Sequence, residues 1–142
     1  MSAADRVRAY YEALRAGEPL APFFAPVDGA VKVGISERLV GGAAVAEGLT
    51  DQTERTTDWS VDSRDLRVTE RGGHAWFGDR VSLAWTDTER RIRYEFDTRW
   101  TGTLERDDAS ERPDGGESDA AAVDGDDRWQ FVAMHVSTAR DL

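Results

Sequence analysis

The chain has 142 residues, 39% of them hydrophobic, which suits one folded domain and excludes general disorder. It has no cysteine, which excludes disulfides and thiolate chemistry, and we expect no cofactor. With 28 acidic and 18 basic residues its formal net charge is −10, which disfavours nucleic acid and anionic membranes as partners. There is no leader-like segment and no long apolar run, so we expect a cytoplasmic protein.

The acidity is concentrated in one segment. Residues 107–128 hold nine acidic residues and two arginines, together with glycines and no periodicity. This composition predicts a flexible hairpin loop, with a functional lid as the alternative. Lys32 is the only lysine in the chain. An acidic, lysine-poor surface indicates adaptation to a high-salt cytoplasm, or else a genome that prefers arginine codons.

Helical patterns occupy the first third of the chain. Ser2 followed by Asp5 predicts a helix start, and an apolar stripe then runs to Gly17, which ends the helix. A short helix is expected from Pro19 to Phe24. Residues 30–35 predict a strand, Gly41 and Gly42 break the chain, and residues 43–53 predict another helix.

From Trp59 onward the apolar period changes to two, which is typical of strands. The alternation changes phase between Val61 and Leu66, and this predicts a β-bulge within one strand. Gly72 and Gly73 predict a hairpin turn. Further strands are expected over residues 74–86, 90–105 and 129–137.

Helices followed by a run of long strands predict a single α+β domain over residues 1–142. Its sheet is expected to be antiparallel or mixed, strongly curved, and cone-shaped. The N-terminal helices are expected to cover the concave side and to leave an open mouth.

Several segments together resemble the SnoaL-like branch of the nuclear transport factor 2-like superfamily. They are the first helix, PFFAP, VKVGIS with the following GG and helix, HAWFGDRVSLAW, RWTGTLER and the closing WQFVAMHVS. The last of these is also similar to the closing strand of the association domain of calcium/calmodulin-dependent protein kinases. The resemblance implies a cone-shaped barrel that forms homodimers through its sheet.

The resemblance does not by itself imply one activity, because the superfamily mixes isomerases, cyclases, dehydratases and non-catalytic binders. The pocket arginines of the kinase association domains correspond here to Gly78, Gly102 and Val136. The catalytic Asp of ketosteroid isomerase-like members corresponds to about Gly34. Both sets of functional groups are therefore missing, although Tyr10 or Tyr11 lies where a tyrosine donor is often found.

Two residues are candidates for catalysis. Asp97 would suit acid/base work if apolar neighbours raised its pKa, but the alternation of its strand places it on the solvated face. His135 with Ser137 could form a nucleophilic pair, but their face is opposite to the expected pocket. His74 is expected to be a solvated turn residue, and the histidines are too far apart for a metal site.

The aromatic and small residues predict one interior pocket, with the hydroxyls of Tyr10 and Tyr94 and the tryptophan N–H groups as its polar donors. The expected lining residues are Tyr10, Trp59, Trp76, Gly78, Tyr94, Trp100, Gly102, Met134 and Val136. The first functional hypothesis is a non-catalytic protein that binds a small apolar or aromatic molecule. The alternatives are an isomerase, cyclase or dehydratase acting on a carbonyl compound, and a dimeric interaction module.

Overall fold

The computed structural model describes residues 1–107 and 129–139. The expected acidic loop at 107–128 therefore lies outside the described residues, apart from Asp107. The elements follow in the order α1 (Ala3–Ala16), η1 (Ala21–Phe23, a 3₁₀ turn), β1 (Val31–Val33), β2 (Arg38–Val40), α2 (Gly42–Arg55), β3 (Thr56–Ser63), β4 (Arg67–Arg71), β5 (His74–Asp87), β6 (Ile92–Arg106) and β7 (Trp129–Thr138).

The first helix begins and ends at the expected residues. The Ser2 hydroxyl accepts from the backbone N–H of Asp5, and the Asp5 carboxylate accepts from that of Ser2, so the capping box is complete. Gly17 ends the helix with a φ of 71°, a left-handed conformation that glycine adopts without strain. The Glu70 side chain of β4 also accepts from the Ala3 N–H at 2.8 Å, which ties the helix start to the sheet.

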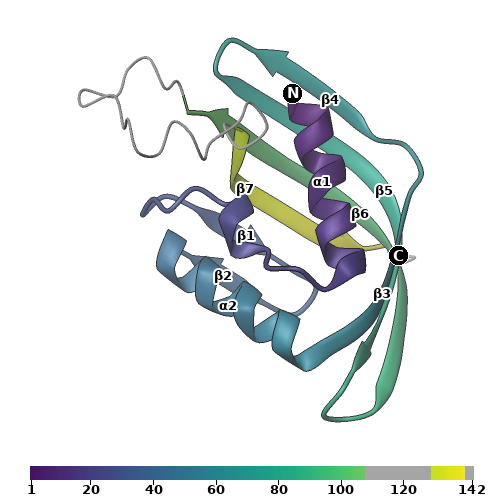
Figure 1. Cartoon of the computed structure of the whole chain (residues 1–142). Coiled ribbons are helices and arrows are strands. Elements are labelled where there is room, and N and C mark those ends of the chain that lie inside the picture. Colours follow the sequence, from purple (N-terminus) through teal and green to yellow (C-terminus); the bar gives the residue numbers. More distant parts are fainter. Residues whose placement is uncertain (108–128, 140–142) are drawn as a thin grey trace.

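The sheet is mixed and strongly curved, as Figure 1 shows. Within the described residues it has seven strands, in the order β2-β1-β7-β6-β5-β3, with β4 also pairing with β5. β1 and β7 run parallel, and the other pairs are antiparallel. The helices lie on the concave side, which confirms the predicted α+β class and architecture.

Two details of the strands differ from the expectation. β2 was not expected, because Arg38–Val40 is too short to show an alternation. The segment after Trp59 is two strands, β3 and β4, so the phase change at Leu66 marks a break rather than a bulge. A bulge does lie upstream: Thr57 pairs with Thr86 and Ser60 with Ala84, so Asp58 and Trp59 together oppose Trp85.

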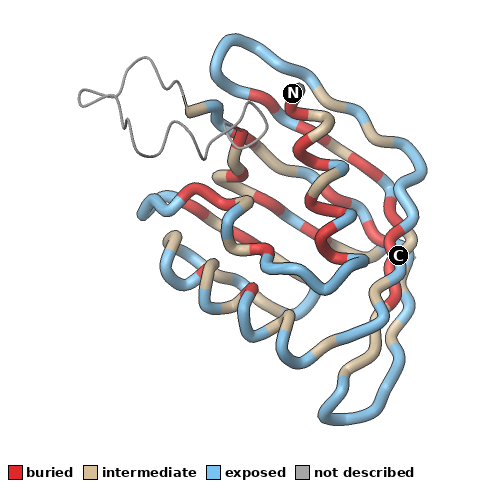
Figure 2. The backbone as a smooth tube through the Cα atoms, viewed as in Figure 1, coloured by how far each residue is buried: buried red, intermediate tan, exposed pale blue. Residues whose placement is uncertain are grey.

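The core lies between α1, η1 and the concave face of the sheet. Figure 2 shows buried positions gathered there, whereas α2 is mostly exposed or half-buried. α2 buries only Val45 and Leu49 among its described residues. The helix therefore contributes few side chains to the core.

Candidate ligand pocket

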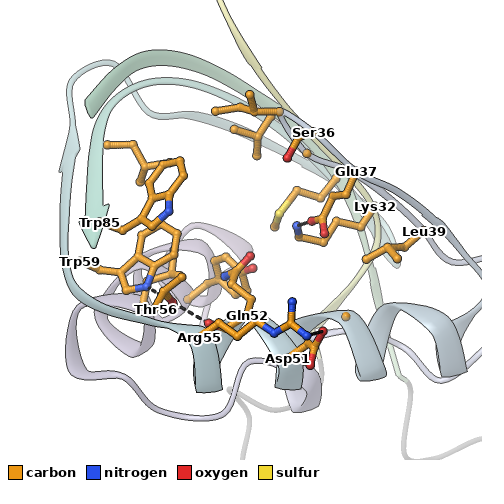
Figure 3. A pocket seen from close by; sticks show the side chains of 18 of the residues that line it. Lys32, Ser36, Glu37, Leu39, Asp51, Gln52, Arg55, Thr56, Trp59 and Trp85 are labelled. Carbon is orange, nitrogen blue, oxygen red and sulfur yellow. Dashed lines mark hydrogen bonds and ion pairs between the residues drawn. The ribbon is translucent and has the colours of Figure 1, made fainter. Parts of the chain in front are cut away.

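A cavity of about 510 Å³ opens on the concave side, between α2, the end of α1 and the sheet. Its volume lies within the range of small-molecule sites. Figure 3 shows side chains from α2, β3 and β5 facing those from the β1–β2 hairpin across the space. The wall also includes Leu14, Leu83, Trp100, Met134 and Val136.

One end of the cavity is aromatic. The rings of Trp59 and Trp85 stack with centroids 4.9 Å apart and planes 18° apart. The upstream bulge makes this contact, because Asp58 takes a left-handed φ of 56° and Trp59 then falls opposite Trp85. The Trp59 ring N–H donates to the Thr56 hydroxyl at 2.8 Å, which fixes the ring orientation. The pair presents a flat, mostly apolar wall to the cavity.

The other end is polar. Lys32 lies in β1, in register with Leu39 of β2 and Met134 of β7, and all three residues line the cavity. Its side chain is buried, and its Nζ forms an ion pair with the Glu37 carboxylate (Figure 3). Gly34 makes room for this pair, because a Cβ there would lie only 2.9 Å from Cγ of Glu37.

Tyr10 brings a hydroxyl group to the same cavity from α1. Tyr10 is 1% exposed, and its ring makes edge contacts with Phe23, Trp100 and Phe131. Burial raises the pKa of Tyr10 above its ordinary value, and the negative charge of Glu37 raises it further. The hydroxyl is therefore a neutral hydrogen-bond donor on the wall of the cavity.

The α2 rim is charged. Arg55 lies 3.7 Å from a carboxylate oxygen of Asp51 and 3.7 Å from one of Glu89. Asp51, Arg55 and Gln52 line the cavity beside Thr56, as Figure 3 shows. This polar rim lies on the α2 side of the cavity.

Five of the expected lining residues do face the cavity: Tyr10, Trp59, Trp100, Met134 and Val136. The expected donors at two of the tryptophans are already used, however. The Trp100 ring N–H donates to the Thr98 hydroxyl at 2.8 Å, and that of Trp59 donates to Thr56. Trp85, which the sequence analysis did not include, lines the cavity, and its N–H has no partner among residues 1–107 and 129–139.

The other four expected residues lie elsewhere, so their predicted placement is wrong. Trp76 and Gly78 point to the outer face of β5, and Trp76 is 46% exposed. Gly102 faces inward, but a Cβ there would lie 2.5 Å from a Phe77 ring carbon, so Phe77 fills the space that Gly102 was expected to leave. Tyr94 lies on the inner face beside Trp85, its register partner, with ring centroids 5.5 Å apart, and it does not line the cavity.

Neither candidate for catalysis faces the cavity. Asp97 is exposed on the outer face, where it accepts from the Ser82 hydroxyl at 3.1 Å. His135 is exposed on the same face, in register with Val33 and Thr101. His74 is also exposed, 3.5 Å from a Glu105 carboxylate oxygen. In the part of the chain that the structure describes, no cluster of three or more histidine, aspartate or glutamate side chains could bind a metal ion.

Asp79 is a buried carboxylate that the sequence analysis missed. It accepts from the Tyr11 hydroxyl at 2.8 Å, the Ser63 hydroxyl at 2.6 Å and the Asp65 N–H at 3.0 Å. Burial and the Asp79 carboxylate both raise the pKa of Tyr11 above its ordinary value. Asp79 does not line the cavity, and its donors satisfy it, so its place is structural.

A family model for the SnoaL-like domain matches residues 4–110, most of the chain. The chain belongs to the SnoaL-like family. This confirms the resemblance that the sequence segments indicate. No curated protein matches this SnoaL-like chain in sequence. None of the helices in the described ranges is long and apolar enough to span a membrane.

Solved structures share the fold of this SnoaL-like protein at low identity. A candidate dehydratase of the NTF2-like family from Streptomyces avermitilis has a TM-score of 0.71 at 16% identity, over 96% of this chain and 92% of that one. An NTF2-like superfamily protein from Salmonella enterica has a TM-score of 0.71 at 12% identity, over 97% of this chain and 89% of that one. A ketosteroid isomerase-like protein from Erwinia carotovora atroseptica has a TM-score of 0.66 at 14% identity, over 96% of this chain and 93% of that one. At these identities the likeness shows the fold alone.

Proposed function

We propose that this SnoaL-like protein binds a small molecule with a flat, apolar or aromatic body and a polar head group. The observation that carries the proposal is the two-ended cavity, with the Trp59–Trp85 stack at one end and Lys32, Glu37 and Tyr10 at the other. Known pockets combine a mostly apolar wall with a few polar groups in the same way. The stack would hold the ring system, and the polar end would bind the head group.

A pair of tryptophan substitutions tests this proposal with 2-naphthylmethanol as the probe. Trp85→Ala removes half of the stack, and we expect it to weaken binding by about tenfold, since an aromatic contact contributes about 1 kcal/mol beyond its buried area. Trp76→Ala is the matched control, because Trp76 is a tryptophan of the same strand on the outer face. It should leave the dissociation constant unchanged. Equal effects of the two substitutions would contradict binding in this cavity.

A second candidate function is proton transfer on a carbonyl compound, as in an isomerase or dehydratase. The observation in its favour is that a carboxylate, Glu37, and a neutral hydroxyl, Tyr10, both line the cavity. Such a reaction needs a base to take the proton and a donor to stabilise the oxygen. Two of the structural neighbours carry names of this kind, a candidate dehydratase and a ketosteroid isomerase-like protein.

Exchange of the α-protons of 2-tetralone in deuterium oxide tests the second candidate. The protein should accelerate exchange, and Glu37→Gln should reduce the acceleration about a hundredfold, because the amide cannot accept the proton. Asp51→Asn, which changes another carboxylate of the cavity, should keep the full rate. Exchange no faster than in buffer would leave binding as the function.

The expected homodimer stays a prediction, which light scattering at high and low salt would test.

A further inference from the structure

Lys32 is placed unusually for a charged residue. It is the only lysine of the chain, it is 5% exposed, and it lines the cavity rather than the surface. Its register partners on the two neighbouring strands, Leu39 and Met134, are both apolar and also line the cavity. Burying an ammonium group is costly unless it is paired, and the Glu37 carboxylate provides that pairing.

The ion pair is a weak explanation for stability alone. Buried ion pairs are often replaced by apolar residues without loss of stability, because desolvation offsets the attraction. Here the hairpin also has Gly34, whose missing side chain lets Glu37 fold back onto the strand. The result is a primary amine, a carboxylate and a neutral hydroxyl, those of Lys32, Glu37 and Tyr10, on the wall of one cavity.

We propose that Lys32 is a nucleophile that forms an imine with the carbonyl group of an aromatic aldehyde or ketone. This rests on the proposed function, since the Trp59–Trp85 stack must first bind the ring system. Lysine amines form such covalent intermediates when a neighbouring group handles the protons. Tyr10 donates a hydrogen bond to the carbonyl oxygen, which polarises the carbonyl carbon for attack.

The step balances with the groups present. The Lys32 ammonium gives a proton to the Glu37 carboxylate, and the amine lone pair forms the C–N bond while the carbonyl π electrons move to oxygen. A proton moves from nitrogen to that oxygen, which gives a carbinolamine. Glu37 then returns its proton to the hydroxyl, which leaves as water while the nitrogen lone pair forms the C=N bond. The product is a protonated imine beside the Glu37 carboxylate, and nothing is oxidised or reduced.

Reductive trapping tests the proposal directly. The full chain is incubated with 2-naphthaldehyde and sodium cyanoborohydride, which reduces the imine to a stable secondary amine. Each trapped amine adds the mass of the aldehyde less one oxygen atom. Peptide mapping then compares Lys32 with the amino terminus of the same molecule, which serves as an internal standard because the chain has no other primary amine. We expect Lys32 to be labelled at least about a hundredfold faster than the amino terminus.

Two variants separate the parts of the proposal. Lys32→Arg keeps the positive charge but should leave only the amino terminus labelled. Glu37→Gln keeps the shape of the side chain but should slow Lys32 labelling about a hundredfold, because the proton acceptor is lost. Labelling of Lys32 no faster than the amino terminus in the wild-type protein would overturn the proposal, and so would full-rate labelling in Glu37→Gln.

The non-reactive alcohol distinguishes this proposal from the proposed function. 2-Naphthylmethanol has the same ring system as the aldehyde but no carbonyl group. If the alcohol binds and Lys32 is not labelled, the cavity binds its ligand without imine chemistry and only the Lys32 proposal fails. If the alcohol does not bind and Lys32 is not labelled, both proposals fail.

Discussion

The Tyr11 hydroxyl of α1 donates a hydrogen bond of 2.8 Å to the Asp79 carboxylate of β5. Asp79 is 6% exposed, and the Ser63 hydroxyl donates to it as well. Asp79→Ala should lower the free energy of unfolding by about 3 kcal/mol, because it leaves buried donors without an acceptor. Asp97→Ala, an exposed carboxylate of the outer face, should change it by less than about 0.5 kcal/mol. Urea denaturation measures both, and similar losses would contradict the structural assignment of Asp79.

The raised pKa values of Tyr10 and Tyr11 predict a loss of stability at alkaline pH. Their stabilising contribution is complete below the ordinary tyrosine pKa of 10.0 and is lost as pH rises above it, because the unfolded chain then releases protons that the folded chain retains. Each buried tyrosine should contribute a slope of about 1.4 kcal/mol per pH unit.

Urea denaturation between about pH 8 and about pH 12 measures this slope. The double variant Tyr10→Phe/Tyr11→Phe should show a clearly flatter dependence than the wild-type protein above the ordinary tyrosine value. An unchanged slope in the double variant would mean that other groups control alkaline unfolding.

Gly102 and Gly78 provide a matched pair in adjacent strands. At Gly102 a new Cβ would lie 2.5 Å from a Phe77 ring carbon and 2.7 Å from the Ala133 carbonyl oxygen. Gly102→Ala should therefore lower the free energy of unfolding by about 2 kcal/mol through overpacking. At Gly78 the nearest atom is 3.7 Å away, so Gly78→Ala should be neutral or stabilise by about 0.5 kcal/mol. Thermal denaturation separates the two, and an equal loss at Gly78 would show that the inner and outer faces of β5 are assigned wrongly.

Much of the fold could be predicted from local patterns. The capping residues Ser2 and Asp5 and the turn at Gly72 act through neighbours in the chain, so the sequence shows them directly. The alternation over β6 also predicts its inner face correctly, because Trp100 and Leu104 are buried there. The three residues of β2 could not be predicted, since their pairing with β1 depends on a turn that leaves no periodic signal.

The inner face of β5 could not be predicted as securely. Aromatic residues occupy both phases of this strand, with Trp76 in one and Phe77 and Trp85 in the other. The register with β6 decides between them, because Phe77 pairs with the inward Gly102 and Trp85 with the inward Tyr94. Trp76 is therefore exposed, and the tryptophan that β5 contributes to the cavity is Trp85.

The polar end of the cavity was missed for a related reason. A lone lysine between Val31 and Val33 indicates a side chain that reaches solvent. The burial of Lys32 depends on Glu37, which lies beyond a turn that no local pattern predicts. Ion pairs formed across such turns are tertiary features, and periodicity does not reveal them.

The methyl groups of the two methionines offer the most direct test of the cavity as a ligand site. Met134 lines the cavity, whereas Met1 is 61% exposed at the start of the chain. In protein labelled with ¹³C at the methionine methyls, titration with 2-naphthylmethanol should shift the Met134 resonance in a saturable way and leave that of Met1 in place. Ring currents from a bound aromatic molecule should make the shift large. A Met134 resonance that does not move, or that moves only together with that of Met1, would contradict ligand binding in this cavity.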